Sequence, residues 1–176
     1  MKKVKVATVW LDGCSGCHMS LLDMDAGIIS LARKIDLVYG PLVDAEEFPE
    51  DVDVTLVEGA VSSQDDLNRI QKIRQRTHVL VSLGDCAVTG NVPGMRNSIP
   101  VQKLLQRIYV DGAQEGKVVP SDRVPALLKQ ARPLREFVKV DLCVPGCPPP
   151  SKAIVGVIND LLDGKKPDAT LKVKFG

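Results

Sequence analysis

Four of the five cysteines in this 176-residue chain stand in short segments that are rich in glycine and proline. Two of them form the close pair Cys14-x-x-Cys17, and Cys86 and Cys147 stand singly further along the chain. Thiolates are strong ligands of iron and zinc, and glycine lets a backbone curl around a bulky inorganic group. These residue types and spacings therefore indicate metal ligation or thiol redox chemistry.

Three interpretations compete for the four thiols: a 4Fe-4S cluster, a structural zinc ion, or a redox dithiol without metal. Structural zinc sites usually contain two close ligand pairs, whereas this sequence has only one. A proline directly after the last cysteine, as in Cys147-Pro148, is typical of iron-sulfur ligand runs. A dithiol would account for the close pair but leave the two single cysteines unexplained. The pattern favours one 4Fe-4S cluster and leaves the other two interpretations open.

Other residues near these segments have two interpretations each. Cys143 falls inside a predicted strand, where a free cysteine is most often a small buried hydrophobe and not a ligand. Glu58 either lies with the cysteines, where it could tune a cluster or move protons, or caps the helix that starts near Ser62. His18 could donate a hydrogen bond or relay a proton, although a lone loop histidine usually does neither. Trp10 is expected in the core.

Short blocks of apolar, β-prone residues alternate along the chain with helical patterns. Strands are predicted at Val4–Trp10, Ile35–Tyr39, Asp53–Val57, His78–Leu83 and Phe137–Val144, and helices at Met19–Arg33, from Ser62 or Ser63 onward, and at Val101–Tyr109, Ala126–Arg132 and Ser151–Gly164. This alternation predicts a parallel sheet that is covered by helices on both faces. We therefore expect a flavodoxin-like α/β domain over residues 1–164, followed by a C-terminal tail of residues 165–176.

The cysteine segments follow the first, fourth and fifth predicted strands. Functional groups in open α/β sheets collect outside the carboxyl ends of the strands, so all four thiols are expected at one edge. The helix that begins after Cys17 points its N-terminus at this edge, and we expect its dipole and free amides to favour an anionic cluster.

The segment from Ala87 to Pro100 is longer than most connections and contains many Gly, Asn, Pro and Ser residues, which predicts a functional loop. It also carries Val88, Val92, Met95 and Ile99, and this mixture suits a permanent interface better than a solvated loop. The polar segment from Asp111 to Pro125 is expected to be an exposed excursion.

Composition excludes several classes of protein. Hydrophobic residues make up 44% and charged residues 26% of the chain, as in ordinary globular proteins. The net charge of +1 gives no basic excess for binding nucleic acid, and no apolar run reaches the length of a membrane span. An odd number of cysteines and no cleavable signal pattern argue against a secreted disulfide framework. We expect a cytoplasmic protein without a membrane or nucleic-acid partner.

Four blocks together make the sequence recognisable: Gly13–Asp23, Val57–Val61, Gly84–Asn91 and Pro145–Pro149. In this order they resemble the small subunit of soluble, bidirectional, NAD-linked nickel-iron hydrogenases, over almost the whole chain. The resemblance implies that Cys14, Cys17, Cys86 and Cys147 hold one proximal 4Fe-4S cluster and that Cys143 is outside the ligand motif. It also implies two partners, a large subunit that holds the nickel-iron centre and a flavin- and iron-sulfur-containing module that reduces NAD.

Three rival functions remain. The first is the small subunit of an electron-bifurcating hydrogenase, and the second is that of a hydrogenase linked to a deazaflavin or ferredoxin. The third, from a different class, is a zinc-stabilised interaction domain without redox activity. The chain is also similar to the cluster-bearing 20 kDa-type subunit of respiratory complex I, but that relative has adjacent cysteines where this chain has Cys14-x-x-Cys17. This difference counts against a quinone reductase.

Overall fold

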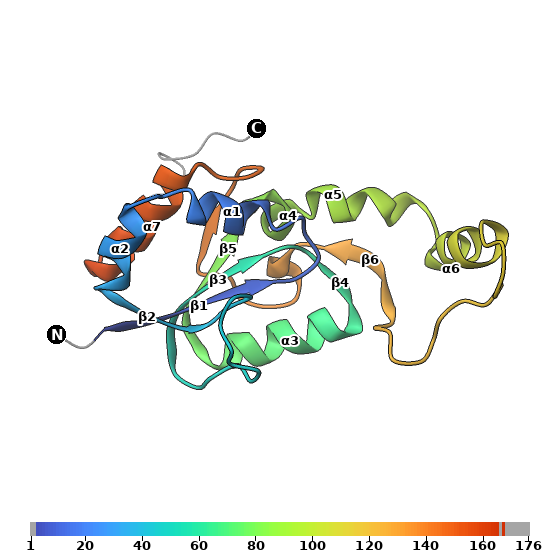
Figure 1. The fold of residues 1–176 in the computed structure, drawn as a ribbon, viewed down its shortest axis with the longest axis horizontal. Coiled ribbons are helices and arrows are strands. Elements are labelled where there is room, and N and C mark those ends of the chain that lie inside the picture. Colours follow the sequence, from blue (N-terminus) through green and yellow to red (C-terminus); the bar gives the residue numbers. More distant parts are fainter. Residues whose placement is uncertain (1–2, 166, 168–176) are drawn as a thin grey trace.

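The computed structural model describes residues 3–165 and residue 167, and its centre is a sheet of five parallel strands in the order β2-β1-β3-β5-β7 (Figure 1). The strands are β1 (Val4–Trp10), β2 (Ile35–Tyr39), β3 (Val52–Glu58), β5 (Thr77–Leu83) and β7 (Leu142–Val144). Counted along the chain, this is the strand order 2-1-3-4-5 of flavodoxin-like folds. The predicted fold class is confirmed.

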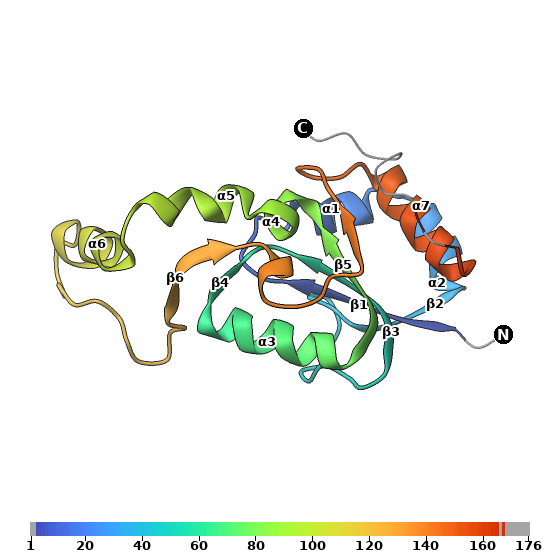
Figure 2. The ribbon, with the colours of Figure 1, turned by 180° about the vertical axis from the view of Figure 1, so that it is seen from behind.

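Helices cover both faces of this sheet (Figures 1 and 2). They are α1 (Gly16–Leu22), α2 (Gly27–Ala32), α3 (Gln64–Gln75), α4 (Gly84–Thr89), α5 (Asn91–Gly94), α6 (Val101–Gln106) and α7 (Ser151–Leu162). Val6 and Leu56 pack in one cluster with Ile154 of α7, whereas Ala7 and Val57 pack in the other with Ile70 of α3. Successive strand residues thus bury opposite faces, which requires a layer of helices on each side.

The start of α3 follows the predicted capping pattern. The Ser63 side chain accepts the backbone N–H of Asp66, and the Asp66 side chain accepts the backbone N–H of Ser63. A cap of this kind stabilises a helix by about 1 kcal/mol. It leaves Glu58 free for another role.

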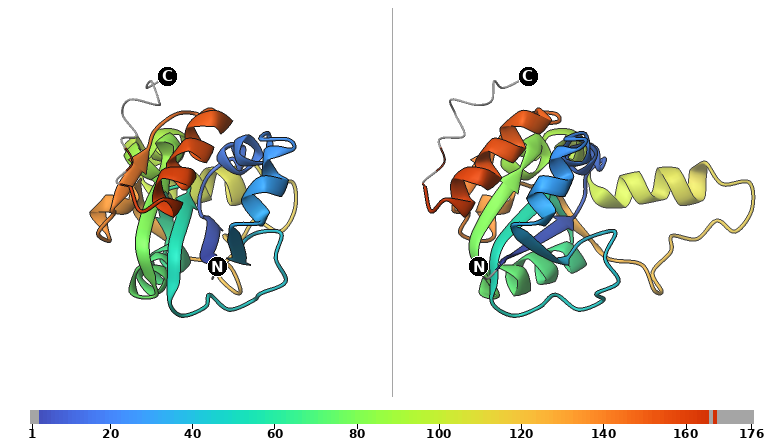
Figure 3. Two further views of the ribbon diagram at one scale, coloured as in Figure 1. Left: turned by 90° about the vertical axis from the view of Figure 1, so that its left-hand side faces the viewer. Right: turned by 60° about the vertical axis from the view of Figure 1, so that its left-hand side comes forward.

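A long excursion, called the arm below, leaves the α/β body between Gly90 and Ala126. It contains α5, η1 (3-10 helix, Met95–Ser98), α6 and η2 (π-helix, Arg107–Asp111), and Figure 3 shows it projecting from one end of the molecule. The chain returns as β6 (Leu127–Arg132), which pairs antiparallel with β4 (Val61–Ser63). The expected excursion from Asp111 to Pro125 is the outer part of this arm.

Three local predictions are wrong, and one short strand was not predicted. The predicted helix Met19–Arg33 is two short helices, because Asp25 adopts a left-handed backbone conformation with φ 50°. The predicted loop from Ala87 to Pro100 is helical, and β4 was missed. The predicted helix Ala126–Arg132 is instead strand β6, since pairing with β4 overrides the weak helical preference of a short segment.

The fifth strand is shorter than predicted. Residues 134–136 form the short helix η3 (Leu134–Glu136), and Phe137 and Val140 pack against the core cluster that contains α3. The chain meets β5 at Asp141, whose N–H donates to Leu80 O at 2.9 Å while its carboxylate accepts from Leu80 N and Arg74 Nη1. Partial burial raises the pKa of Asp141, but these two donors outweigh it and hold the pKa below its ordinary value.

No helix in the described part of the chain is long and apolar enough to cross a membrane. The proposed tail of residues 165–176 lies almost wholly outside the described residues.

Candidate metal centre

The four cysteines singled out from the sequence gather at the carboxyl edge of the sheet. Cys14 and Cys17 follow β1, with Cys17 as the second residue of α1. Cys86 lies in the first turn of α4, directly after β5, and Cys147 follows β7. The charges of Cys14, Cys86 and Cys147 all act on the Cys17 thiol, so the structure brings the four sulfurs into one neighbourhood.

These thiols oppose one another's ionisation. Burial raises the pKa of Cys17 far above its ordinary value, and the charges of Glu58 and the other three cysteines raise it further. Burial also raises the pKa of Cys86, against a hydrogen bond from the backbone of Val92. A group of thiolates in such a place needs compensating positive charge, which metal ions supply. The donor set therefore fits a metal-containing group.

The backbone around the sulfurs leaves room for nothing larger than glycine at one position. Gly84 has φ +81°, and a Cβ atom there would lie 2.2 Å from the Cys17 Sγ. Two real atoms do not approach so closely, so Cys17 can keep its side-chain position only if residue 84 is glycine. The glycine flank noted in the sequence thus has a definite steric cause.

Hydrogen bonds join the segments that carry the cysteines. Asp85 N donates to Gly146 O at 2.9 Å, and Gly146 N donates to Asp85 Oδ1 at 2.7 Å. The Ser20 hydroxyl on α1 donates to Pro149 O at 2.6 Å. The Cys86 segment is thus held to the Cys147 segment, and α1 is held to the chain just beyond Cys147. Sequence reasoning missed Asp85 and Ser20, and the only local signal was the position of Asp85 directly before Cys86.

The fifth cysteine stands apart from this group. Cys143 is in β7, where burial raises its pKa and Arg135 lowers it, and the four other cysteines are not among the groups that shift it. It is only half-buried, so the prediction of a buried hydrophobe was right about its place in a strand and wrong about its degree of burial.

Glu58 lies at the end of β3 and is 2% exposed. Its carboxylate accepts from Cys17 N at 3.4 Å and from His18 N at 3.0 Å, and it lies 2.5 Å from His18 Nδ1. It therefore caps α1, and the interpretation that it caps the helix near Ser62 is wrong. The expectation that the first amides of α1 are free for a cluster is also wrong for these two N–H groups.

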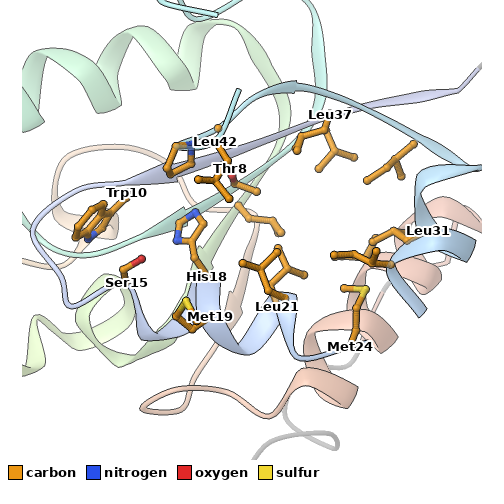
Figure 4. A pocket seen from close by; sticks show the side chains of 18 residues that line it. Thr8, Trp10, Ser15, His18, Met19, Leu21, Met24, Leu31, Leu37 and Leu42 are labelled. Atoms are coloured by element: carbon orange, nitrogen blue, oxygen red, sulfur yellow. The ribbon is translucent and has the colours of Figure 1, made fainter. Parts of the chain in front are cut away.

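An apolar cavity of about 390 Å³ adjoins this edge between α1, α2 and the first two strands (Figure 4). His18 and Trp10 line it together with aliphatic residues such as Leu21 and Leu37. The prediction that Trp10 is a core residue is wrong, because its side chain is 43% exposed and donates from Nε1 to Gly13 O at 2.9 Å.

Among the described residues, no three His, Cys, Asp or Glu side chains converge tightly enough to hold a single metal ion.

Comparison with known proteins gives a consistent group of relatives. Residues 14–161 match the family described as NADH ubiquinone oxidoreductase, 20 Kd subunit. The chain is 38% identical to a subunit of the F420-non-reducing hydrogenase vhu of Methanocaldococcus jannaschii over 97% of its own length, but spans only 60% of that relative. It is 39% identical to the NAD-reducing hydrogenase HoxS subunit delta of Cupriavidus necator, covering 93% of this chain and 80% of that one.

Solved structures agree with the sequence comparison. A chain of the NAD+-reducing NiFe hydrogenase in its H2-reduced state superposes with a TM-score of 0.94 at 33% identity, covering 99% of this chain and 100% of that one. A chain of the NiFeSe hydrogenase of Desulfomicrobium baculatum, at 22% identity and a TM-score of 0.63, shares the fold over 93% of this chain.

Proposed function

Because the chain belongs to the NADH ubiquinone oxidoreductase 20 Kd subunit family, we propose that it is the electron-transfer small subunit of a nickel-iron hydrogenase linked to NAD. The observation that carries this proposal is the gathering of four cysteines at one sheet edge in a chain that matches a chain of the NAD+-reducing enzyme along its entire length. A cytoplasmic location and a domain spanning residues 1–164 are parts of the same proposal.

Cys14, Cys17, Cys86 and Cys147 would hold one 4Fe-4S cluster. When bound, such a cluster accepts and donates single electrons, over a range of potentials that depends on its surroundings. The chain's own residues hold the sulfurs in place. Asp85 holds two of the cysteine segments together, Gly84 makes room for Cys17, and the core cluster of the sheet buries Cys17 on its inner side.

The electron acceptor is the finer part of the proposal. Relatives of this chain include subunits of both NAD-reducing and F420-non-reducing hydrogenases. A chain of the NAD+-reducing enzyme superposes on 99% of this chain with a TM-score of 0.94, which favours NAD. The partners would then be a nickel-iron large subunit and a flavin-containing module that reduces NAD.

Replacing Cys147 by serine in the assembled enzyme tests the function. We expect hydrogen-driven NAD reduction to fall strongly, while dye reduction by NADH persists because it needs only the flavin module. Iron content is measured beside both activities, since serine can sometimes replace cysteine as a ligand. Retained hydrogen-driven NAD reduction in a variant that lacks the cluster would defeat the proposal. Stoichiometric zinc without iron or acid-labile sulfide in the wild-type chain would instead support the zinc-stabilised domain.

The segment from Ala87 to Pro100, which includes the base of the arm, is the proposed docking surface for the large subunit. Val92, Met95 and Ile99 are exposed on this segment, and the Val92 backbone lies beside Cys86, whereas Val88 is buried in the body. Exposed apolar side chains grouped on one projecting element are typical of permanent interfaces.

Hydrogen exchange measures this docking. Amides from Asn91 to Ser98 are expected to exchange at least about tenfold more slowly in the complex than in the isolated chain, because burial removes them from water. The amides of α3 on the opposite face serve as the internal control and should exchange alike in both. Equal exchange of the arm in both samples would rule out the docking.

A further inference from the structure

Glu58 is a buried carboxylate whose three contacts all go to the residue pair Cys17–His18. It does not pair with any lysine or arginine among the ion pairs of the described residues, where its one partner is His18. A buried carboxylate costs free energy unless its oxygens accept hydrogen bonds, and here two backbone N–H groups and a ring nitrogen supply them. The arrangement therefore fixes the backbone at one of the four candidate ligands.

The backbone of Glu58 is held against the segment that follows β1. Leu11 N donates to the Glu58 carbonyl at 2.9 Å, and Asp12 and Ala60 exchange two backbone hydrogen bonds just beyond it. Gly59 has φ +94°, and a Cβ atom there would lie 2.8 Å from the Leu11 carbonyl carbon. The segment after β1, which carries Cys14 and Cys17, is thus packed directly on the segment that carries Glu58.

The hydrogen bonds also indicate where the proton on His18 lies. The carboxylate already accepts two backbone N–H groups, so its short contact with His18 is best made by an Nδ1–H donor. His18 Nε2 is buried and has no hydrogen-bond partner. The ring thus gives its Nδ1 donor to Glu58 and stands between the carboxylate and the apolar cavity.

From this geometry we propose that Glu58 is a positioning residue of the cluster site, which holds the Cys17–His18 backbone and places a fixed negative charge beside the sulfurs. This proposal rests on the proposed function, because it takes the four cysteines as the ligands of a cluster. The carboxylate oxygens lie 3.4 Å from Cys17 N and 3.0 Å from His18 N, so the charge stands directly beside the backbone of one candidate ligand. Negative charge near a redox centre favours the oxidised state, and the structure assigns this effect to Glu58.

The test compares midpoint potentials of the full chain purified without oxygen. Glu58→Gln keeps the size of the side chain and removes its charge, so we expect iron content to persist and the potential to become more positive. His18→Phe keeps the ring but removes the Nδ1–H donor, so the charge is less compensated and the potential should become more negative. Glu47 lies between β2 and β3 and pairs with Lys72 in the last turn of α3, so Glu47→Gln removes the same charge away from the sulfurs and should change nothing.

Opposite shifts in the first two variants would be expected from a charge effect and not from general loosening of the fold. Loss of iron from a Glu58→Gln chain with an unchanged melting temperature would also support the positioning role. Iron retained with the wild-type potential and wild-type electron paramagnetic resonance spectrum in Glu58→Gln would overturn the proposal. If that variant does not fold, an unchanged potential in His18→Phe overturns it instead. Absence of iron from the wild-type chain would refute the proposed function and is thereby distinguished from these outcomes.

Discussion

Replacing Cys86 by alanine is expected to reduce the iron and acid-labile sulfide bound to the purified chain to near background. Cys86 is one of four thiols that the structure gathers at the sheet edge, and its removal leaves three ligands for a group that takes four. Iron per chain and the absorbance near the brown charge-transfer bands measure the effect.

The matched control for this variant is Cys143→Ala. Cys143 is also a cysteine near the end of a strand, and its pKa is also raised by burial, but it stands apart from the other sulfurs. Its replacement should leave iron content intact and lower stability by about 1 kcal/mol or less, because only a small half-buried group is lost. Unchanged iron in Cys86→Ala, or lost iron in Cys143→Ala, would contradict the assignment of ligands.

Gly84→Ala is expected to abolish iron binding although no cysteine is replaced. The added methyl group would meet the Cys17 Sγ at 2.2 Å, so either the sulfur turns away or the start of α4 shifts. The left-handed backbone at this residue adds strain of about 1–2 kcal/mol for any residue with a Cβ. Iron content and melting temperature, measured together, check the prediction.

Gly116→Ala separates the steric effect from the backbone strain. Gly116 also has a positive φ of 63°, but no atom lies within 4 Å of the position of its Cβ. This variant carries the strain alone, so it should lower the melting temperature slightly and keep the iron of the wild-type chain. Equal iron content in Gly84→Ala and Gly116→Ala would show that the space left by Gly84 is not required for iron binding.

The sequence was sufficient to predict those parts of the fold that rest on buried periodic patterns. Val4–Trp10 was predicted to the residue, and the carboxyl-edge rule placed four cysteines together, because parallel strands must present their ends at one edge. The helix cap at Ser63 followed from local chemistry alone. These features depend on a few neighbouring residues or on a single topological rule.

The errors arose where tertiary contacts outweigh local preference. β6 is a strand because β4 pairs with it, and Phe137 and Val140 pack against the core cluster that contains α3, so that only Leu142–Val144 of the predicted fifth strand enter the sheet. The capping of α1 by Glu58 joins residues 40 and 41 positions apart, which no local pattern records. The hydrogen bond from Gly146 N to the Asp85 side chain likewise joins residues 61 positions apart.

The base of the arm is fastened at both of its ends. Asn97 donates from Nδ2 to Ala131 O at 2.7 Å and accepts Ala131 N at 2.8 Å, while Arg96 donates to the carbonyls of Ser62 and Leu128. The chain on both sides of residues 98–126 is therefore held in place by hydrogen bonds to the α/β body and to β6. Their length and composition can change over evolution without moving either end, since chain insertions are tolerated where the flanking backbone is independently held. One α/β body could in this way acquire different assembly specificities through exchange of a single outer segment.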